Sequence, residues 1–287
     1  MPSLAKLFAH NPTQHATNIE AIKNFAPNLL RTSKRRDLEE AVAKYITQDP
    51  ASLDMLAQAR ILAFRKDPVL INGPTGTGKE LVANILNSQC YTPSNDPAFP
   101  GLHIPITPIN CAGLTETLFE SLIHGHKRGS YTGAVSDEPG LLRSASSGSA
   151  FFDEVGELPL SQQAKLLRVL QTSRVRPVGD TAEYPISCRF IFATHRDLKQ
   201  MVKDGTFRAD LYYRISRFVL HTSPLSSRPC DIPLIVKSIY EQEGWSLADP
   251  VPPPPQAYSE GNVRQLQNYL FRVEVLLLSP EEALFDL

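Results

Sequence analysis

The sequence has few cysteines, and they lie far apart. Its 287 residues include four, at Cys90, Cys111, Cys188 and Cys230, and no two of them form a CxxC pair. This spacing argues against a disulfide framework and against a zinc site. Scattered thiols of this kind are typical of a protein from a reducing compartment.

Long hydrophobic runs and an excess of one charge are also missing. No apolar stretch approaches the length of a membrane span, and residues 1–15 lack the continuous apolar core of a signal peptide. The formal net charge is −1, so composition gives no reason to expect a nucleic-acid wrapper or a membrane-surface binder. Hydrophobic residues make up 42% of the chain, which is enough for a packed core. We therefore expect a globular protein of the cytoplasm.

The pattern of apolar residues divides the chain into three parts. Residues 1–49 are expected to form a short helical extension, because Leu38, Val42, Tyr45 and Ile46 share one helical stripe. Across residues 50–222, strand-like runs alternate with helix-like segments, which predicts an α/β domain with a parallel sheet flanked by helices. Residues 223–287 predict a small helical lid, in which four prolines at 252–255 form an extended connector.

A glycine-rich stretch follows the apolar run 68–71 and precedes a helix-like segment at 80–86. The stretch and the two residues after it are Gly73, Pro74, Thr75, Gly76, Thr77, Gly78, Lys79, Glu80 and Leu81. Glycines let backbone N–H groups face phosphates, the helix N-terminus adds partial positive charge, and the lysine reaches the terminal phosphates. The strand before and the helix after favour a phosphate-binding loop over an ordinary glycine-rich turn. Glu80 stands where a Ser or Thr usually follows the lysine of such loops.

Two adjacent carboxylates end the apolar run 150–152. Asp153 would hold Mg²⁺ through its water shell, and Glu154 would polarise the water that attacks the terminal phosphate. A strand that ends in solvated acids is common, so the pair indicates a nucleotide site only in combination with the phosphate-binding loop. Together they predict that the chain binds ATP and Mg²⁺.

In this order, these and further motifs resemble the central AAA+ ATPase domain of sigma-54-dependent transcriptional activators, also called bacterial enhancer-binding proteins. The resemblance covers about residues 50–275 and implies an AAA+ P-loop NTPase with a helical lid. In this family glutamate after the lysine is usual, so Glu80 is expected beside Asp153 near the metal. The resemblance also implies a switch residue, a sensor I threonine, two arginine fingers and a sensor II arginine, here Asn110, Thr194, Arg208, Arg214 and Arg264.

The two candidate arginine fingers lie six residues apart in the string FRADLYYR. On an ideal helix Arg208 and Arg214 would be roughly 120° apart, yet two long side chains could converge on one phosphate. By resemblance they would project into the nucleotide site of a neighbouring subunit. Activity would then depend on a homo-oligomeric ring, usually a hexamer. Without the flanking string, two surface arginines would be the better interpretation.

A second glycine-rich stretch resembles the loop with which this family contacts sigma-54. It consists of Gly129, Ser130, Tyr131, Thr132, Gly133 and Ala134, where the family usually reads GAFTGA. The glycines permit a tight hairpin tip, and Tyr131 and Thr132 would give that tip an exposed aromatic face and a hydroxyl. The resemblance implies contact with sigma-54 in the RNA polymerase holoenzyme. A short turn without a partner is the alternative.

The resemblance implies an ATP-hydrolysing module that remodels the sigma-54 closed complex to activate transcription. We recognise no helix-turn-helix after Arg264 and no receiver before the ATPase, so we expect a minimal activator without its own sequence-specific DNA binding, or a truncated product. The lid is shorter than the family leads us to expect, and His195 stands where we expect asparagine; both could alter coupling. The alternatives are an AAA+ ATPase with another protein client and a degenerate regulator of related rings.

Overall fold

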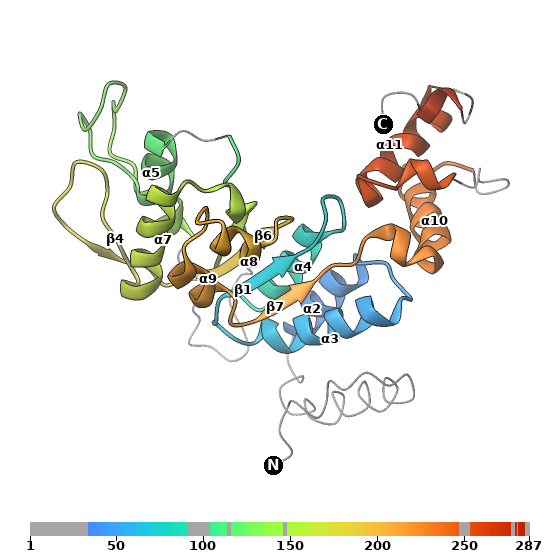
Figure 1. The fold of residues 1–287 in the computed structure, drawn as a ribbon, viewed down its shortest axis with the longest axis horizontal. Coiled ribbons are helices and arrows are strands. Elements are labelled where there is room, and N and C mark those ends of the chain that lie inside the picture. Colours follow the sequence, from blue (N-terminus) through green and yellow to red (C-terminus); the bar gives the residue numbers. More distant parts are fainter. Residues whose placement is uncertain are drawn as a thin grey trace, which may run out of the picture.

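The computed structural model has a central sheet covered by helices, with long loops at one end and a helical lid at the other (Figure 1). It describes residues 34–90, 104–113, 116–145, 148–246, 253–276, 279 and 281–284. Most of the expected N-terminal extension, residues 1–33, lies outside the described residues, and so does the beginning of the proline run.

The sheet has five strands in the order β2-β3-β6-β1-β7, and every neighbouring pair is parallel. The strands are β1 (Val69–Asn72), β2 (Thr107–Asn110), β3 (Ser149–Asp153), β6 (Arg189–Thr194) and β7 (Val219–His221). Because all strands run in one direction, their carboxyl ends meet at one edge of the sheet, where ligands of such folds bind. The register places Asn110 beside Asp153 and Asn72 beside Thr194 at this edge.

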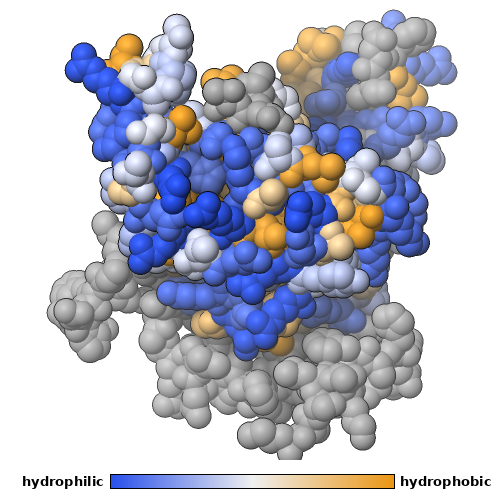
Figure 2. Space-filling view, turned by 60° about the vertical axis from the view of Figure 1, so that its left-hand side comes forward, coloured by the Kyte–Doolittle hydropathy of each residue, from blue (hydrophilic) through white to orange (hydrophobic). Residues whose placement is uncertain are grey.

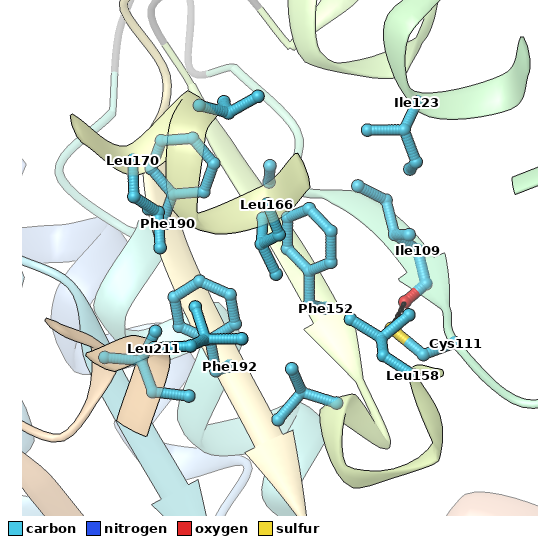
Figure 3. Close-up of a cluster of buried hydrophobic side chains, with 14 of the residues drawn as sticks. Ile109, Cys111, Ile123, Phe152, Leu158, Leu166, Leu170, Phe190, Phe192 and Leu211 are labelled. Carbon is cyan, nitrogen blue, oxygen red and sulfur yellow. Dashed lines mark hydrogen bonds between the residues drawn. The ribbon is translucent and has the colours of Figure 1, made fainter. Parts of the chain in front are cut away.

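Helices cover both faces of the sheet because alternate strand residues point to opposite sides. Phe151 and Ile191 face a core with α2 (Lys34–Ala43), α3 (Pro50–Ala63) and α4 (Lys79–Asn87). Phe152 and its neighbours on β6 face the other core, shown in Figure 3. That second core is completed by α5 (Glu116–His124), α6 (Leu141–Ser144), α7 (Leu160–Thr172), α8 (Leu198–Lys203) and α9 (Ala209–Ile215).

The described part of the N-terminal segment is packed into the first of these cores. Leu38, Val42 and Tyr45 are buried there, and α2 contacts α4. The predicted boundary at residue 50 stays a prediction. The packing nevertheless joins α2 to the α/β core, so this helix is not a separate arm.

The C-terminal residues build a third, smaller core. Its two main helices are α10 (Ile232–Glu243) and α11 (Asn262–Val275). The short turns η3 (Leu225–Ser227) and η4 (Pro229–Asp231) precede α10, η5 (Pro255–Ala257) lies between the helices, and η6 (Glu282–Leu284) follows α11. Pro254 is extended, with φ −69° and ψ 157°. The predicted fold class, a parallel sheet flanked by helices with a helical lid, is confirmed. Among the helices of the described ranges, none is both long enough and apolar enough to cross a membrane.

Candidate functional site

The glycine-rich stretch forms a loop between β1 and α4 at the carboxyl edge of the sheet. Gly76 and Gly78 have φ values of 75° and 93°, in the left-handed region where a side chain causes strain. Gly78 is the residue that precedes α4. The amides of the first helical turn have no partners within the helix, so they can bind an anion in the loop.

The side chain of Lys79 lies in the hollow of this loop. It is 8% exposed, and its Nζ donates hydrogen bonds to the carbonyl oxygens of Gly73 at 3.0 Å and Pro74 at 3.2 Å. The same Nζ lies 3.5 Å from Oε1 of Glu154. The structure therefore brings the lysine and the acidic pair together at one site.

Glu154 has an unusual backbone and a polar partner just after β6, the neighbouring strand of the sheet. Its φ of 54° and ψ of 49° are left-handed, a conformation that costs free energy in a non-glycine residue and clusters at functional sites. Its Oε2 accepts from the backbone N–H of His195 at 3.2 Å and lies 2.7 Å from the Nδ1 of that residue. Burial raises the pKa of Glu154, but the hydrogen bond with His195 and the charge of Lys79 outweigh it and hold the pKa below its usual value. The carboxylate thus stays ionised, as a group that orients water requires.

Asp153 lies beside Glu154 but titrates in the opposite direction. Burial and the charge of Glu154 raise its pKa, and the charge of Lys79 offsets part of this rise. The described residues hold no group of three or more His, Cys, Asp or Glu side chains able to bind a metal. Mg²⁺ does not need one, because it usually takes one or two carboxylates together with phosphate oxygens and water. Asp153 fits that pattern; Glu80 is exposed in the first turn of α4, and its metal role stays a prediction.

Asn110 and Thr194 reach the same edge, but their polar atoms bond elsewhere. The Oδ1 of Asn110 accepts from the N–H of Ala112 at 2.9 Å, and the buried hydroxyl of Thr194 accepts from the N–H of Arg196 at 3.1 Å. Neither side chain bonds to Glu154. The side chain of Glu154 hydrogen-bonds to His195 instead. From the sequence, His195 is notable only because it replaces the expected asparagine.

The two candidate arginine fingers lie at opposite ends of α9. Arg208 precedes the helix as its N-cap, so the helical angle expected between the two arginines does not apply. Its guanidinium pairs with Asp210 at 2.7 Å, and Arg214 donates to the carbonyl of Leu170 at 2.9 Å. Within the described part of the chain, the bonds of both guanidiniums are with residues of α9 and α7, and not with the phosphate-binding loop or the acidic pair.

Sensor II is represented by Arg264 in the first turn of α11. Its side chain is exposed, and its Cβ lies 3.3 Å from the position that a Cβ added at Gly76 would take. The start of α11 therefore lies against the phosphate-binding loop, and the side chain of Arg264 leaves the backbone beside Gly76.

The stretch 129–134 forms a closed turn at the opposite end of the molecule from the lid. The N–H of Gly129 donates to Ala134 O at 2.8 Å, and the N–H of Ala134 donates to Tyr131 O at 3.0 Å. The base of the loop is tied to a second loop between β4 (Arg174–Val175) and β5 (Tyr184–Pro185), through Lys127 N–H to Val178 O at 3.0 Å.

The expected exposed aromatic face of this turn is wrong. Tyr131 is half-buried, its hydroxyl lies 3.2 Å from Ser121 Oγ, and its ring packs edge-on to His126 at 5.1 Å. The exposed residues of the motif are Gly129, Thr132 and Gly133, and just beyond it Val135 is 81% exposed. The face turned forward in Figure 2 is mainly hydrophilic and carries apolar side chains in small groups.

The parallel sheet, the phosphate-binding loop and the acidic pair define the AAA+ class of P-loop proteins. Residues 45–221 match the Sigma-54 interaction domain family, and the chain belongs to this family. The predicted family and fold class are thereby confirmed.

Two curated relatives illustrate the similarity. The chain is 40% identical over 247 residues to the transcriptional regulatory protein GlrR of Escherichia coli K12, covering 82% of this chain and 53% of GlrR. It is 37% identical over 241 residues to the response regulator protein PilR of Pseudomonas aeruginosa, covering 81% of this chain and 52% of PilR. The chain thus spans about half the length of the curated relatives it matches.

Solved structures agree with this assignment. NtrX from Brucella abortus in complex with ADP has a TM-score of 0.67 and 27% identity, with 92% of this chain and 57% of NtrX covered. A mutant of RuvB from Thermotoga maritima has a TM-score of 0.53 over 82% of this chain and 64% of RuvB; at 18% identity it supports the fold alone.

Proposed function

We propose that the chain is the ATP-hydrolysing module through which a sigma-54-dependent regulator acts on the sigma-54 RNA polymerase holoenzyme. The observation that carries the proposal is the buried Lys79 amine, 3.5 Å from Glu154, in the loop before α4 of a Sigma-54 interaction domain. NtrX, a structural relative at 27% identity with ADP and 26% with ATP, has been solved in complex with each nucleotide.

The residues around Lys79 have the chemistry that phosphoryl transfer to water needs. The phosphates of ATP would lie on the loop amides, and Lys79 would leave the carbonyls of Gly73 and Pro74 to reach them. Asp153, with Glu80 near it, would hold Mg²⁺ through water, and the bound ion supplies positive charge to the phosphate oxygens. Glu154 would orient a water whose oxygen attacks the terminal phosphorus and would take its proton as the bond to ADP breaks.

A homo-oligomeric ring, a hexamer by family resemblance, would complete the site. Arg208 and Arg214 would then act on the nucleotide of a neighbouring subunit, where cations stabilise the charge of the transferred group. The Arg208 pair with Asp210 does not oppose this, because both side chains are more than 40% exposed and such surface pairs are weak. Asn110, Thr194 and Arg264 would report the nucleotide state to the ring.

The loop 129–134 would make the contact with sigma-54. Thr132 is exposed at its tip, and the loop lies at the end of the molecule far from the lid, so a partner can reach it without covering the nucleotide. Movement of this loop during the ATP cycle would remodel the closed complex.

The test is co-elution of the purified chain with sigma-54 in the presence of ADP and aluminium fluoride, which together mimic the transferred phosphoryl group. The wild type is compared with Thr132→Ala and with Thr181→Ala, an exposed threonine of the neighbouring β4–β5 connection. We expect a nucleotide-dependent complex that Thr132→Ala loses and Thr181→Ala keeps, with ATP hydrolysis intact in both variants. No complex from a chain that hydrolyses ATP would indicate another protein client. Loss of both activities in Thr132→Ala would refute a separate contact loop.

A further inference from the structure

The lid touches the phosphate-binding loop through its backbone. The N–H of Val263, in the first turn of α11, donates to the carbonyl of Gly76 at 3.1 Å. A Cβ added at Gly76 would lie only 2.0 Å from the carbonyl oxygen of Gly261. At this distance only glycine fits, so loop and lid are in direct contact at Gly76.

The first residue of α11 adds side-chain bonds to this contact. Asn262 is 2% exposed; its Nδ2 donates to the carbonyl of Thr75 at 2.9 Å, and its Oδ1 accepts from the N–H of Leu225 at 2.6 Å. Leu225 is fully buried in the lid core, in the turn that leads from β7 into the lid. One buried amide therefore joins the phosphate-binding loop, the linker and α11.

Few residue types can occupy this position. The φ of Asn262 is 56°, in the left-handed region that only glycine, asparagine and aspartate enter readily. Only asparagine among these three has both a donor for Thr75 and an acceptor for Leu225. Glycine would keep the backbone and lose both bonds, and aspartate would keep the acceptor alone.

Other contacts hold the opposite side of the loop. The hydroxyls of Thr77 and Thr222 lie 2.7 Å apart, and the Tyr45 hydroxyl donates to Thr77 O at 3.3 Å. These bonds come from β7 and from the N-terminal segment, so a change at Asn262 leaves them in place. The lid adds a long bond from Arg228 to Thr77 O at 3.5 Å on this side, whereas the bonds from α11 secure the tip of the loop, at Thr75 and Gly76.

We propose that Asn262 is a positioning residue of the nucleotide site, which ties the tip of the phosphate-binding loop to the lid. Its bonds keep the Thr75 and Gly76 backbone in one conformation before ATP arrives, and a preorganised loop binds more tightly because less ordering is needed on binding. A rotation of the lid would have to carry the loop tip with it or break these bonds. Only the prediction about ATP affinity rests on the proposed nucleotide-binding function.

The test compares Asn262→Gly with Gln265→Ala. Gln265 lies in the same turn, and its side chain bonds to Gly261 N–H at 2.9 Å and to Gln256 O at 3.0 Å, both residues of the lid and neither a residue of the phosphate-binding loop. Without nucleotide, we expect the Val263 amide to exchange with deuterium at least tenfold faster in Asn262→Gly and at the wild-type rate in Gln265→Ala. We expect about tenfold weaker binding of a fluorescent ATP analogue in Asn262→Gly only, with kcat at saturating ATP within about twofold of wild type.

The single tryptophan provides the control for folding. Trp245 packs edge-on against Tyr240 and Phe271 in the lid, so its emission shows whether the lid is intact in each variant. Wild-type exchange at Val263 in a folded Asn262→Gly variant, or equal loosening in Gln265→Ala, would overturn the proposal.

A second variant covers the case in which Asn262→Gly does not fold. Asn262→Asp keeps the left-handed backbone and the acceptor for Leu225 but loses the donor to Thr75, so the Val263 amide should again exchange faster. Unchanged exchange in this variant would also overturn the proposal. The exchange measurement needs no ATP. A chain that failed to bind nucleotide would therefore refute the proposed function, and the exchange of the Val263 amide would still test the role of Asn262.

Discussion

The nucleotide end and the loop end of this molecule use polar side chains in opposite ways. At the nucleotide end, Lys79 is 8% exposed and Asn262 is 2% exposed, and each bonds to backbone carbonyls of the phosphate-binding loop. At the loop end, Thr132 is exposed, and Lys127 pairs with Asp137 on the surface at 2.8 Å. In Figure 1 the sheet lies between these two ends.

The difference fits the role proposed for each end. Stabilising charge on a transferred phosphoryl group requires donors that are fixed before the reaction, and burial fixes them. Contact with a partner requires side chains that solvent, and therefore a partner, can reach. Substitutions at the nucleotide end should therefore change binding and stability strongly, and substitutions at the loop end should change them little.

The largest effect is expected from Lys79→Ala. The variant removes the one buried cation that lies within 3.5 Å of Glu154 among the described residues, so the affinity for ATP should fall roughly 100-fold, or about 2.7 kcal/mol. Titration with a fluorescent ATP analogue measures this. Lys127→Ala, a surface lysine of the loop end, should bind ATP as the wild type does. Ordinary ATP affinity in Lys79→Ala would refute the assignment of the phosphate-binding loop.

The next effect concerns stability at the amino edge of the sheet, where Arg189 begins β6. Arg189 is 4% exposed and donates to the carbonyls that end α4 and α3, Leu86 O at 2.6 Å and Leu62 O at 2.8 Å. Burial lowers its pKa to about 10, so it stays charged at neutral pH. Arg189→Met leaves both carbonyls without this donor and should lower the free energy of unfolding by about 3 kcal/mol.

Urea unfolding of Arg189→Met checks this value, with Arg65→Met as the control. Arg65 is 52% exposed and pairs with Asp67 on the surface, so its replacement should cost less than about 1 kcal/mol. If both variants lost the same free energy of unfolding, burial of the guanidinium would not determine how much an arginine contributes to stability.

The nucleotide end could be predicted from sequence because its residues follow strands in short, ordered motifs. The alternation of Phe151 and Phe152 between two cores follows from strand geometry, and parallel strands necessarily bring Gly73 and Asp153 to one edge. The contacts of His195 with Glu154 were not predicted, although its position at the end of β6, beside Thr194, was the available signal.

Other features depend on partners far away in the chain. Asn262 bonds to Thr75, 187 residues earlier, and nothing in the local sequence names that partner. Likewise, a turn sequence does not say whether Tyr131 points outward or back onto α5, because Ser121 and His126 decide this. Such packing outcomes are set by tertiary contacts and cannot be read from motif order.

Smaller effects are expected when one aspartate at each end is replaced by asparagine, and the melting temperature should change in opposite directions. The pKa of Asp153 is raised by burial and by the charge of Glu154, so its ionised form is unfavourable in the folded state. As pH rises above about 4, this ionisation costs stability. Asp153→Asn should therefore melt roughly 1–3 °C above the wild type at pH 7, a difference that fades as pH falls towards 4.

Asp137 supplies the opposite case at the loop end. Hydrogen bonds from the Arg128 N–H and from Lys127 lower its pKa, so its contribution is present at neutral pH and is lost as pH falls through the lowered pKa. Asp137→Asn should melt slightly below the wild type at pH 7, and added salt should shrink the difference. Thermal melts from pH 4 to 7 compare the two variants. A lower melting temperature for Asp153→Asn than for the wild type at pH 7 would contradict an unfavourable ionisation of Asp153 by burial and by the charge of Glu154.

The smallest effect is expected from Tyr131→Phe, which tests whether the loop end is held at all. The variant keeps the ring against His126 and removes only the hydroxyl that lies 3.2 Å from Ser121 Oγ, so the loss should be about 0.5–1 kcal/mol, with ATP hydrolysis unchanged. Deuterium exchange at the Gly129 and Ala134 amides, which close the turn, should rise. Tyr213→Phe, at a ring that is 76% exposed on α9, should leave these amides unaffected. If exchange in the turn stays at the wild-type rate in Tyr131→Phe, the hydroxyl does not anchor the loop, and its shape depends on the backbone bonds of its glycines.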